Sequence, residues 1–200
     1  GLDHESRLWC PVWMGALGPA ELEECFGEKI DQEEVYSEAI EQWESYRSGT
    51  LVDRTLQFYT KLYLQDDILA KVDRASMMHS LEVRAPFLDI DFVNFVRRIP
   101  WFYKIRGGET KYLLKKALEP LLPNDILYRS KKGFGMPIGS WFNSGAVALP
   151  TTNLPGIDPS YIANQLVAHR NGASDERAFL WGTLTMASFI GRMGSGQLRS

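Results

Sequence analysis

Three features of the sequence predict a mainly helical fold. Helix-capping residues recur along the chain, evidence for strands is thin, and a long apolar helix is indicated near the C-terminus. The chain has 200 residues, of which 44% are hydrophobic and 12% aromatic, so it can bury a packed core. We expect one helical domain over residues 1–200, with a loop-rich stretch at about 143–157.

Capping residues place the expected helices of the first half. Proline or aspartate at the start and glycine at the end predict helices over about 19–27 and 31–46. A third helix, at about 52–64, leads into a fourth that begins at Asp66, because paired carboxylates suit the first turn of a helix.

The second half carries similar signals. Asp89 is expected to cap a helix that ends before Pro100, and Thr110 to cap a helix over 111–119. A short helical turn is expected at 124–128. The glycine-containing stretch RSKKGFGMPIGSWF, residues 129–142, is expected to be a loop.

Two further helices are expected beyond that loop. Asp158 and Pro159 begin the first, and Asn171 with Gly172 ends it. Ser174 is expected to cap the second, whose segment FLWGTLTMASFI is apolar nearly all round and is therefore expected to be buried.

Composition excludes several classes of function. The net charge of -3 and the pI near 5.7 argue against nucleic acid as the main partner. Cys10 and Cys25 lack the spacing of a zinc site, and no apolar run of about 18 residues or secretory signal is present. We expect a cytoplasmic protein without membrane contact. Residues 21–44 are acidic and residues 97–132 basic, so an anionic ligand should prefer the second stretch.

Glu82 stands out because it ends an apolar stripe. If the helix that begins at Asp66 continues, one of its faces carries Ile68, Val72, Ala75, His79 and Glu82. A carboxylate taken out of water needs a partner or a chemical role. Two interpretations are open: Glu82 is a catalytic or orienting group, or it forms a structural ion pair with Arg84 or Arg74.

Lys131 lies in a second notable segment, the glycine-flanked basic stretch over 128–135. Its ammonium group could be brought close to a phosphate, where adjacent backbone N–H groups would add donors. The alternative is a solvated basic turn. The glycine spacing does not fit the dinucleotide-binding fingerprint, and no Ser-His-Asp arrangement or metal-spaced histidine pair can be assembled.

Three segments in order resemble the synthetase half of glutamine-dependent asparagine synthetases and their amidotransferase relatives. They are DDILAKVDRASMMHSLEVRAPFLDIDFVNF, KYLLKKAL and LLPNDILYRSKKGFGMPIGSWF, and the resemblance covers roughly residues 56–142. The resemblance implies the helical C-terminal portion of an adenine-nucleotide α-hydrolase-like (ATP pyrophosphatase) synthetase domain.

The resemblance also implies a two-step reaction. ATP would activate a carboxylate, normally the side chain of aspartate, as an acyl-adenylate with loss of pyrophosphate. Ammonia from glutamine would then displace AMP and leave an amide. Magnesium would accompany the nucleotide, and the protein would hold the reacting groups in line and neutralise charge on the departing pyrophosphate.

Five residues match the family's motifs. Lys131 is expected to face the phosphates, in preference to Lys132, with Gly133 beside it. Glu82 and Arg84 are expected at the edge of the synthetase site, where Glu82 would orient the incoming amine or anchor the site. Lys111 matches a basic position whose role stays open. Lys131 and Glu82 should then border a common hollow.

Family elements missing from this sequence define the remaining expectations. The serine- and glycine-rich pyrophosphate loop and the N-terminal cysteine nucleophile do not appear, and the chain begins without methionine. We therefore expect a C-terminal fragment that is inactive alone and that partners the rest of the synthetase and the glutaminase domain. A related ligase with a different carboxylate substrate and a noncatalytic helical interaction module are the alternatives, and homo-oligomerisation stays open.

Overall fold

The computed structural model describes residues 4–131, 133, 135–149 and 154–194. The chain divides into two compact units, called here unit 1 (residues 1–41 and 135–200) and unit 2 (residues 42–134). The single domain expected over residues 1–200 stays a prediction, because one domain can contain more than one compact unit. No helix among the described residues is long and apolar enough to cross a membrane.

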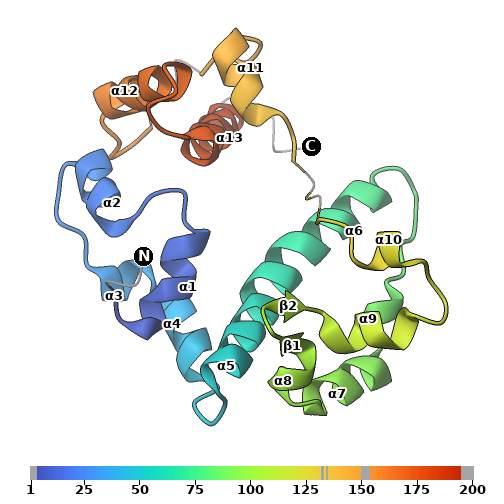
Figure 1. Cartoon of the computed structure of the whole chain (residues 1–200). Helices are drawn as coiled ribbons and strands as arrows, with labels where there is room; N and C mark the ends of the chain where they lie inside the picture. Colours follow the sequence, from blue (N-terminus) through green and yellow to red (C-terminus); the bar gives the residue numbers. More distant parts are fainter. Residues whose placement is uncertain (1–3, 132, 134, 150–153, 195–200) are drawn as a thin grey trace. The chain divides into compact units, whose positions relative to one another are not determined.

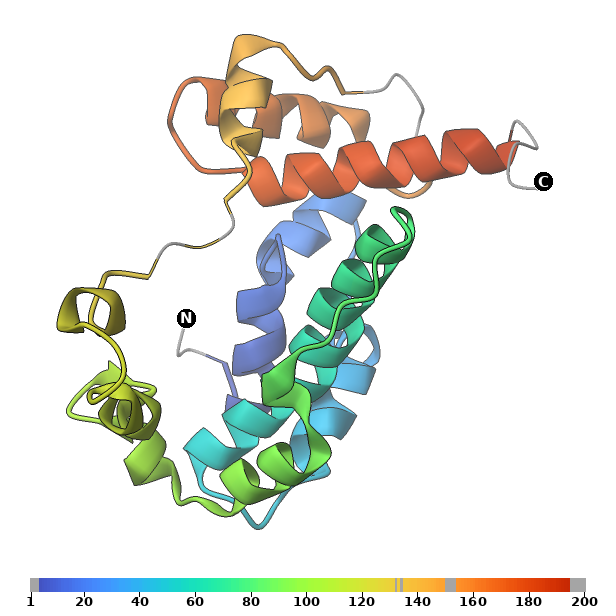
Figure 2. The same cartoon turned by 90° about the vertical axis from the view of Figure 1, so that its right-hand side faces the viewer.

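Unit 1 is built from short helices and one long one. They are α1 (Ser6–Met14), α2 (Pro19–Phe26), α3 (Gln32–Val35), α11 (Ile138–Ser144), α12 (Pro159–Arg170) and α13 (Arg177–Gly194), with α4 (Ser37–Glu44) crossing the boundary to unit 2. The last three helices contact one another and lie together in both views (Figure 1, Figure 2).

The core of unit 1 joins helices from both of its sequence segments. Leu17 and Cys25 pack with Phe142, Tyr161, Phe179 and Leu180. The rings of Tyr161 and Phe179 meet edge to face at 5.6 Å, a favoured aromatic geometry. Burial of these side chains therefore connects the α2 region to α11, α12 and α13.

Unit 2 consists of a helical rod followed by short elements. Its elements are α5 (Leu51–Phe58), η1 (Tyr59–Leu69), α6 (Ala70–Met77), η2 (Pro86–Leu88), α7 (Ile90–Arg98), α8 (Trp101–Lys104), β1 (Ile105–Arg106), β2 (Glu109–Thr110), α9 (Tyr112–Leu118) and α10 (Asn124–Leu127). The two strands pair antiparallel, with Ile105 opposite Thr110.

The rod runs without a break from Leu51 to Met77 (Figure 1). The junction residues Tyr59 and Ala70 keep right-handed helical backbone angles, and the middle section is a π-helix, a rare conformation in which each turn holds an extra residue. The expected separation into a helix at 52–64 and another beginning at Asp66 is wrong. Asp66 lies inside the rod, because no glycine or proline interrupts this stretch.

The C-terminal end of the rod decides the geometry near Glu82. Ser80 adopts a left-handed backbone with φ 56°, Leu81 N–H donates to Ser76 C=O at 3.0 Å, and Ser80 N–H donates to Met77 C=O at 2.9 Å. This hydrogen-bond pattern is a Schellman motif, which ends helices. The helical stripe expected to reach Glu82 therefore stops before it, and that expectation is wrong.

Several local expectations are confirmed. Gly27 ends α2 with a left-handed φ of 70°, and Asp89 caps α7 by accepting a hydrogen bond from Phe92 N–H at 3.0 Å. Asp158 caps α12 by accepting from Ser160 N–H at 2.8 Å. Each cap depends on neighbours within four residues, which explains why sequence alone located it.

Other boundaries differ from expectation. The helix expected over 31–46 is divided at Tyr36, and Thr110 lies in β2 because Gly107 and Gly108, both with positive φ, form the turn of a hairpin. Within the expected loop at 129–142, the part from Ile138 onward is helical.

The last helix needs correction, whereas the loop-rich stretch expected at about 143–157 stays a prediction. Residues 145–149 and 154–158 contain no helix, and 150–153 lie outside the described residues. α13 begins at Arg177, and Leu180 N–H donates to Glu176 C=O, so Ser174 is not its cap. It is buried on one side only, since Met186 and Phe189 are more than half exposed while Leu180 is fully buried.

Candidate functional site

Glu82 and Arg84 form an exposed ion pair on an extended segment after the rod. One carboxylate oxygen of Glu82 contacts Nη2 of Arg84, and the two side chains are 69% and 87% exposed. Glu82 is therefore not a buried carboxylate, because the chain leaves the helix at Ser80 before the apolar stripe can reach it. Of the two partners considered for it, Arg84 is the one that pairs. A pair this exposed contributes little to stability.

Lys131 lies in the segment that connects α10 to α11 and is exposed, as is Gly133. Lys132, the less favoured of the two lysines, lies outside the described residues. Among the described residues Lys131 has no carboxylate partner, so its ammonium group is available to an external anion.

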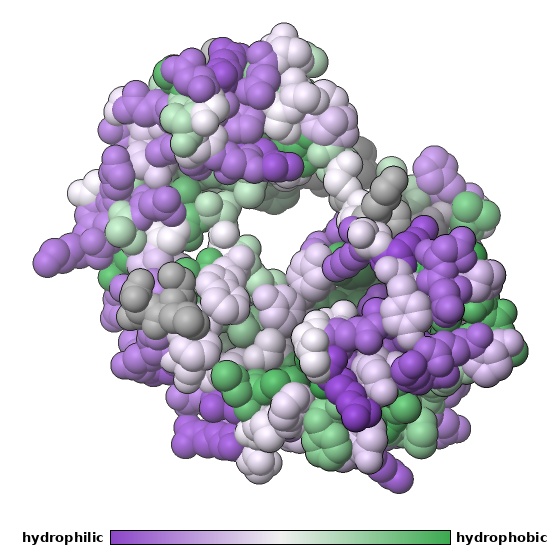
Figure 3. All heavy atoms as spheres, in the orientation of Figure 1, coloured by the Kyte–Doolittle hydropathy of each residue, from purple (hydrophilic) through white to green (hydrophobic). Residues whose placement is uncertain are grey.

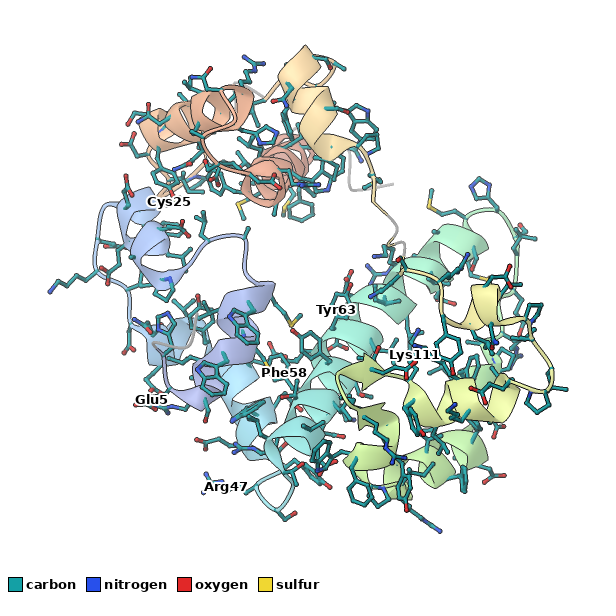
Figure 4. All side chains as sticks on the ribbon, viewed as in Figure 1. Glu5, Cys25, Arg47, Phe58, Tyr63 and Lys111 are labelled. Atoms are coloured by element: carbon teal, nitrogen blue, oxygen red, sulfur yellow. The ribbon has the colours of Figure 1, made fainter. Side chains whose placement is uncertain are left out.

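Lys111 occupies the junction between β2 and α9 (Figure 4). Its φ of 58° is left-handed, a conformation that costs a residue with a Cβ about 1–2 kcal/mol. The side chain is exposed and, like that of Lys131, has no carboxylate partner within the described part of the chain. The conformation allows the chain to turn from the hairpin directly into α9.

The two lysines that follow Lys111 are paired. Lys115 Nζ lies 2.8 Å from Glu109, in a contact whose two side chains are 22% and 31% exposed, and Lys116 Nζ lies 2.6 Å from Glu119. Lys115 also lies 5.1 Å from the ring centre of Tyr128. Lys115 and Lys116 are thus neutralised by carboxylates, whereas Lys111 and Lys131 have no such partner among the residues that the structure describes.

Hydrogen bonds shift the pKa values of Glu119 and Tyr128, which lie beside these lysines. The pKa of the Glu119 carboxyl lies below its ordinary value, chiefly because Lys116 donates to it and also because the Tyr128 hydroxyl does. The pKa of Tyr128 is raised, mainly by the same hydrogen bond to Glu119. The network therefore keeps Glu119 ionised and Tyr128 neutral.

All the matched positions described above lie in unit 2, but the structure does not establish the common hollow expected for Lys131 and Glu82. Two pockets formed by the described residues are lined by other side chains. The shared hollow therefore stays a prediction.

One pocket, of about 550 Å³, lies in unit 1 beside His169. The ring Nε2 lies 3.2 Å from Gly139 C=O, and Nδ1 accepts from Glu176 N–H at 3.3 Å. Asp175 at the same pocket pairs with Arg177, whose hydrogen bond lowers the pKa of the Asp175 carboxyl. Sequence reasoning missed His169, because a single histidine in the last turn of a helix gives no signal of burial.

The second pocket, of about 340 Å³, lies in unit 2 between the first part of the rod and α7. Arg97 and Lys104 line it together with apolar side chains. The basic composition of residues 97–132 predicts affinity for anions in this region. The apolar side chains that line the same pocket could not be predicted from the sequence.

The described residues contain no cluster of metal-binding side chains. Within the described residues no group of three or more His, Cys, Asp or Glu side chains could hold a metal ion.

Comparison with known families gives the class of this chain. A family model described as asparagine synthase matches residues 6–190. The chain therefore belongs to the asparagine synthase family. The expected fold class is confirmed: the chain is mainly helical, and the family is one of the adenine-nucleotide α-hydrolase-like synthetases.

Individual relatives agree with the family assignment. A putative glutamine-hydrolyzing asparagine synthetase of Mycobacterium tuberculosis is 39% identical over 135 residues, covering 64% of this chain and 20% of the relative. Glutamine-hydrolyzing asparagine synthetase 1 of Bacillus subtilis is 43% identical over 82 residues, covering 41% of this chain and 13% of the relative. The chain thus spans about a fifth or less of the length of these relatives. No solved structure matches it.

Proposed function

We propose that this chain is the C-terminal part of the synthetase domain of an ATP- and glutamine-dependent asparagine synthetase. The family match over residues 6–190 carries the proposal. Aspartate is the carboxylate substrate, ammonia released from glutamine is the nitrogen donor, and the glutaminase domain and the rest of the synthetase are the partners. The cytoplasm is the proposed location.

The chemistry proceeds in two substitutions. An oxygen of the aspartate side-chain carboxylate attacks the α-phosphorus of ATP, and the bond to pyrophosphate breaks. Ammonia then attacks the acyl carbon of the adenylate, AMP leaves with the electron pair of the carbon–oxygen bond, and a proton is lost to give the amide. Magnesium, when bound with ATP, supplies charge neutralisation on the phosphates.

Lys131 is proposed to stabilise the departing pyrophosphate. Its exposed ammonium has no carboxylate partner among the described residues, whereas Lys115 and Lys116 are neutralised by Glu109 and Glu119. A positive charge aimed at oxygens that gain negative charge lowers the barrier to pyrophosphate loss. Gly133 is proposed to add a backbone N–H donor, because a residue without a Cβ allows close approach of a ligand to the backbone.

Glu82 and Arg84 are proposed to border the site as a pair. Their exposure and mutual contact leave one oxygen of Glu82 available to accept from the incoming ammonia, while Arg84 holds the other in place. Lys111, also exposed and without a described carboxylate partner, is proposed to add positive charge for the nucleotide.

A test of the proposed reaction is ATP–pyrophosphate exchange by the full-length enzyme that carries these residues. Exchange should require aspartate, and glutamate or other carboxylic acids should not replace it. Exchange provoked by a different acid would show a related amide ligase with another substrate. No exchange with any acid would favour a noncatalytic helical module.

A further inference from the structure

The pocket of unit 2 has an apolar wall that is partly open to solvent. Its lining includes Leu56 of α5, Phe87 of η2, and Phe92 and Val93 of α7. Phe87 is 61% exposed, and its ring lies 5.6 Å from that of Phe92. Figure 3 shows that hydrophobic residues lie at the surface of the chain among hydrophilic ones. Apolar side chains gathered in a concave wall can bind an apolar ligand, because covering them removes them from water.

Polar groups of the same pocket carry a net positive charge. Arg97 and Lys104 both line it, and neither has a carboxylate partner among the residues described in this structure. Arg97 donates to the neutral amide oxygen of Gln57, at 3.4 Å. Asp53 supplies the one acidic side chain of the lining, and its carboxylate already accepts from Thr50 N–H and Oγ1 at the start of α5.

The balance of charges favours a monoanion. Two cations and one carboxylate leave one positive charge, which a single carboxylate neutralises, whereas Asp53 would repel the second charge of a phosphate monoester. A guanidinium group also matches the two oxygens of a carboxylate with two parallel hydrogen bonds. The volume of about 340 Å³ lies at the lower end of the range of small-molecule sites.

We propose that this pocket binds a small carboxylate with an apolar body, whose carboxylate pairs with Arg97 and Lys104 and whose body covers Phe87, Phe92 and Val93. The site uses none of the residues assigned above to adenylation. Its presence or absence therefore leaves the proposed synthetase function untouched, and each can fail without the other.

Titration of the ¹⁵N-labelled chain with 3-phenylpropionate, followed by amide chemical shifts, tests the site. Saturable binding is expected, with shifts concentrated in α5 and α7. Propionate, which lacks the apolar body, and 3-phenylpropanol, which lacks the charge, should each bind at least about 5-fold more weakly.

Variants distinguish specific binding of 3-phenylpropionate in the pocket from general attraction of an anion to the basic surface. Arg97→Gln should weaken 3-phenylpropionate binding about 5- to 10-fold. Arg98→Gln removes the same charge from the next position of α7, outside the pocket lining, and should change binding less than about 2-fold. Val93→Phe, which fills the pocket with another apolar side chain, should abolish binding.

The proposal is overturned by any of three results: no saturable binding at millimolar concentrations of 3-phenylpropionate, equal binding of 3-phenylpropanol, or equal effects of Arg97→Gln and Arg98→Gln. Circular dichroism of each variant shows whether it keeps its helices. Equal losses in the two arginine variants with unchanged helicity would indicate attraction by the surface charge alone.

Discussion

The Tyr128 hydroxyl donates a hydrogen bond of 2.6 Å to the same oxygen of Glu119 that receives Lys116 at 2.6 Å. This contact connects α9 to the residue that follows α10, three positions before Lys131. It holds the start of the segment that carries Lys131 while neutralising a nearby lysine. The network thus fixes the start of the segment that carries Lys131. It also neutralises Lys116, whereas Lys131 has no carboxylate partner among the described residues.

Replacing Tyr128 by phenylalanine tests this network. Loss of the hydroxyl should raise the pKa of the Glu119 carboxyl toward its ordinary value, because one of the donors that stabilise the ionised form is removed. The stability that this carboxyl contributes is present above its unfolded pKa and is lost as the pH falls through its lowered folded pKa. NMR titration of the Glu119 side-chain carbon would measure the shift, and an unchanged titration would contradict the assigned network.

Burial of Tyr161 should make the stability of unit 1 depend on pH in the alkaline range. Burial raises its pKa to about 12, with smaller contributions from nearby acidic groups including Cys25. A folded pKa above the unfolded value means that the contribution to stability is complete below pH 10 and is lost as the pH rises through about 12.

The variant Tyr161→Phe should therefore lose less stability between pH 10 and 12 than the unsubstituted chain. Chemical denaturation at both pH values, followed by circular dichroism, measures the difference. Tyr63, which is 43% exposed, provides the matched control as Tyr63→Phe. Identical pH dependence in the unsubstituted chain and Tyr161→Phe would count against the assignment.

Ser80 should be replaceable by glycine with a gain in stability. Ser80 has a left-handed φ of 56° and occupies the position after the helix end where glycine is common. Glycine adopts this conformation without a steric cost. We expect Ser80→Gly to raise the free energy of unfolding by about 0.5–1 kcal/mol. Ser76→Gly, inside α6, should lower it by a similar amount. Urea denaturation measures both, and destabilisation by Ser80→Gly would show that the helix does not end as described.

Glu82 and Arg84 should matter for activity far more than for stability. Because both side chains are largely exposed, Glu82→Gln and Arg84→Gln should change the free energy of unfolding by less than about 0.5 kcal/mol. In the full-length enzyme each should reduce amide formation at least about 10-fold if the pair borders the reacting groups. Activity equal to that of the unsubstituted enzyme in both variants would make the pair merely a surface contact.

Much of the helical framework could be predicted from local sequence. Asp89, Asp158 and Gly27 act on backbone groups within a few residues, so their capping roles need no knowledge of tertiary structure. The family motifs likewise predicted the class of protein, which the match over residues 6–190 confirms.

The predictions that were wrong concern places where the backbone conformation or the tertiary contacts differ from what the sequence pattern indicates. No glycine or proline marks the helix end at Ser80, so the sequence pattern predicts a stripe that continues to a buried Glu82, whereas the structure exposes this carboxylate. The glycine pair before Thr110 favours a hairpin over a cap. His169 and the lining of the unit 2 pocket depend on contacts between distant residues, which periodicity cannot show.

The most direct test of the central claim is pyrophosphate release by the full-length enzyme with Lys131 replaced by alanine. We predict a loss in kcat of about 100-fold or more, as for removal of a group that stabilises charge in the transition state. Lys61→Ala, an exposed lysine of the rod, should release pyrophosphate at the rate of the unsubstituted enzyme. Equal rates in the Lys131 and Lys61 variants would contradict the proposed role of this loop in adenylation.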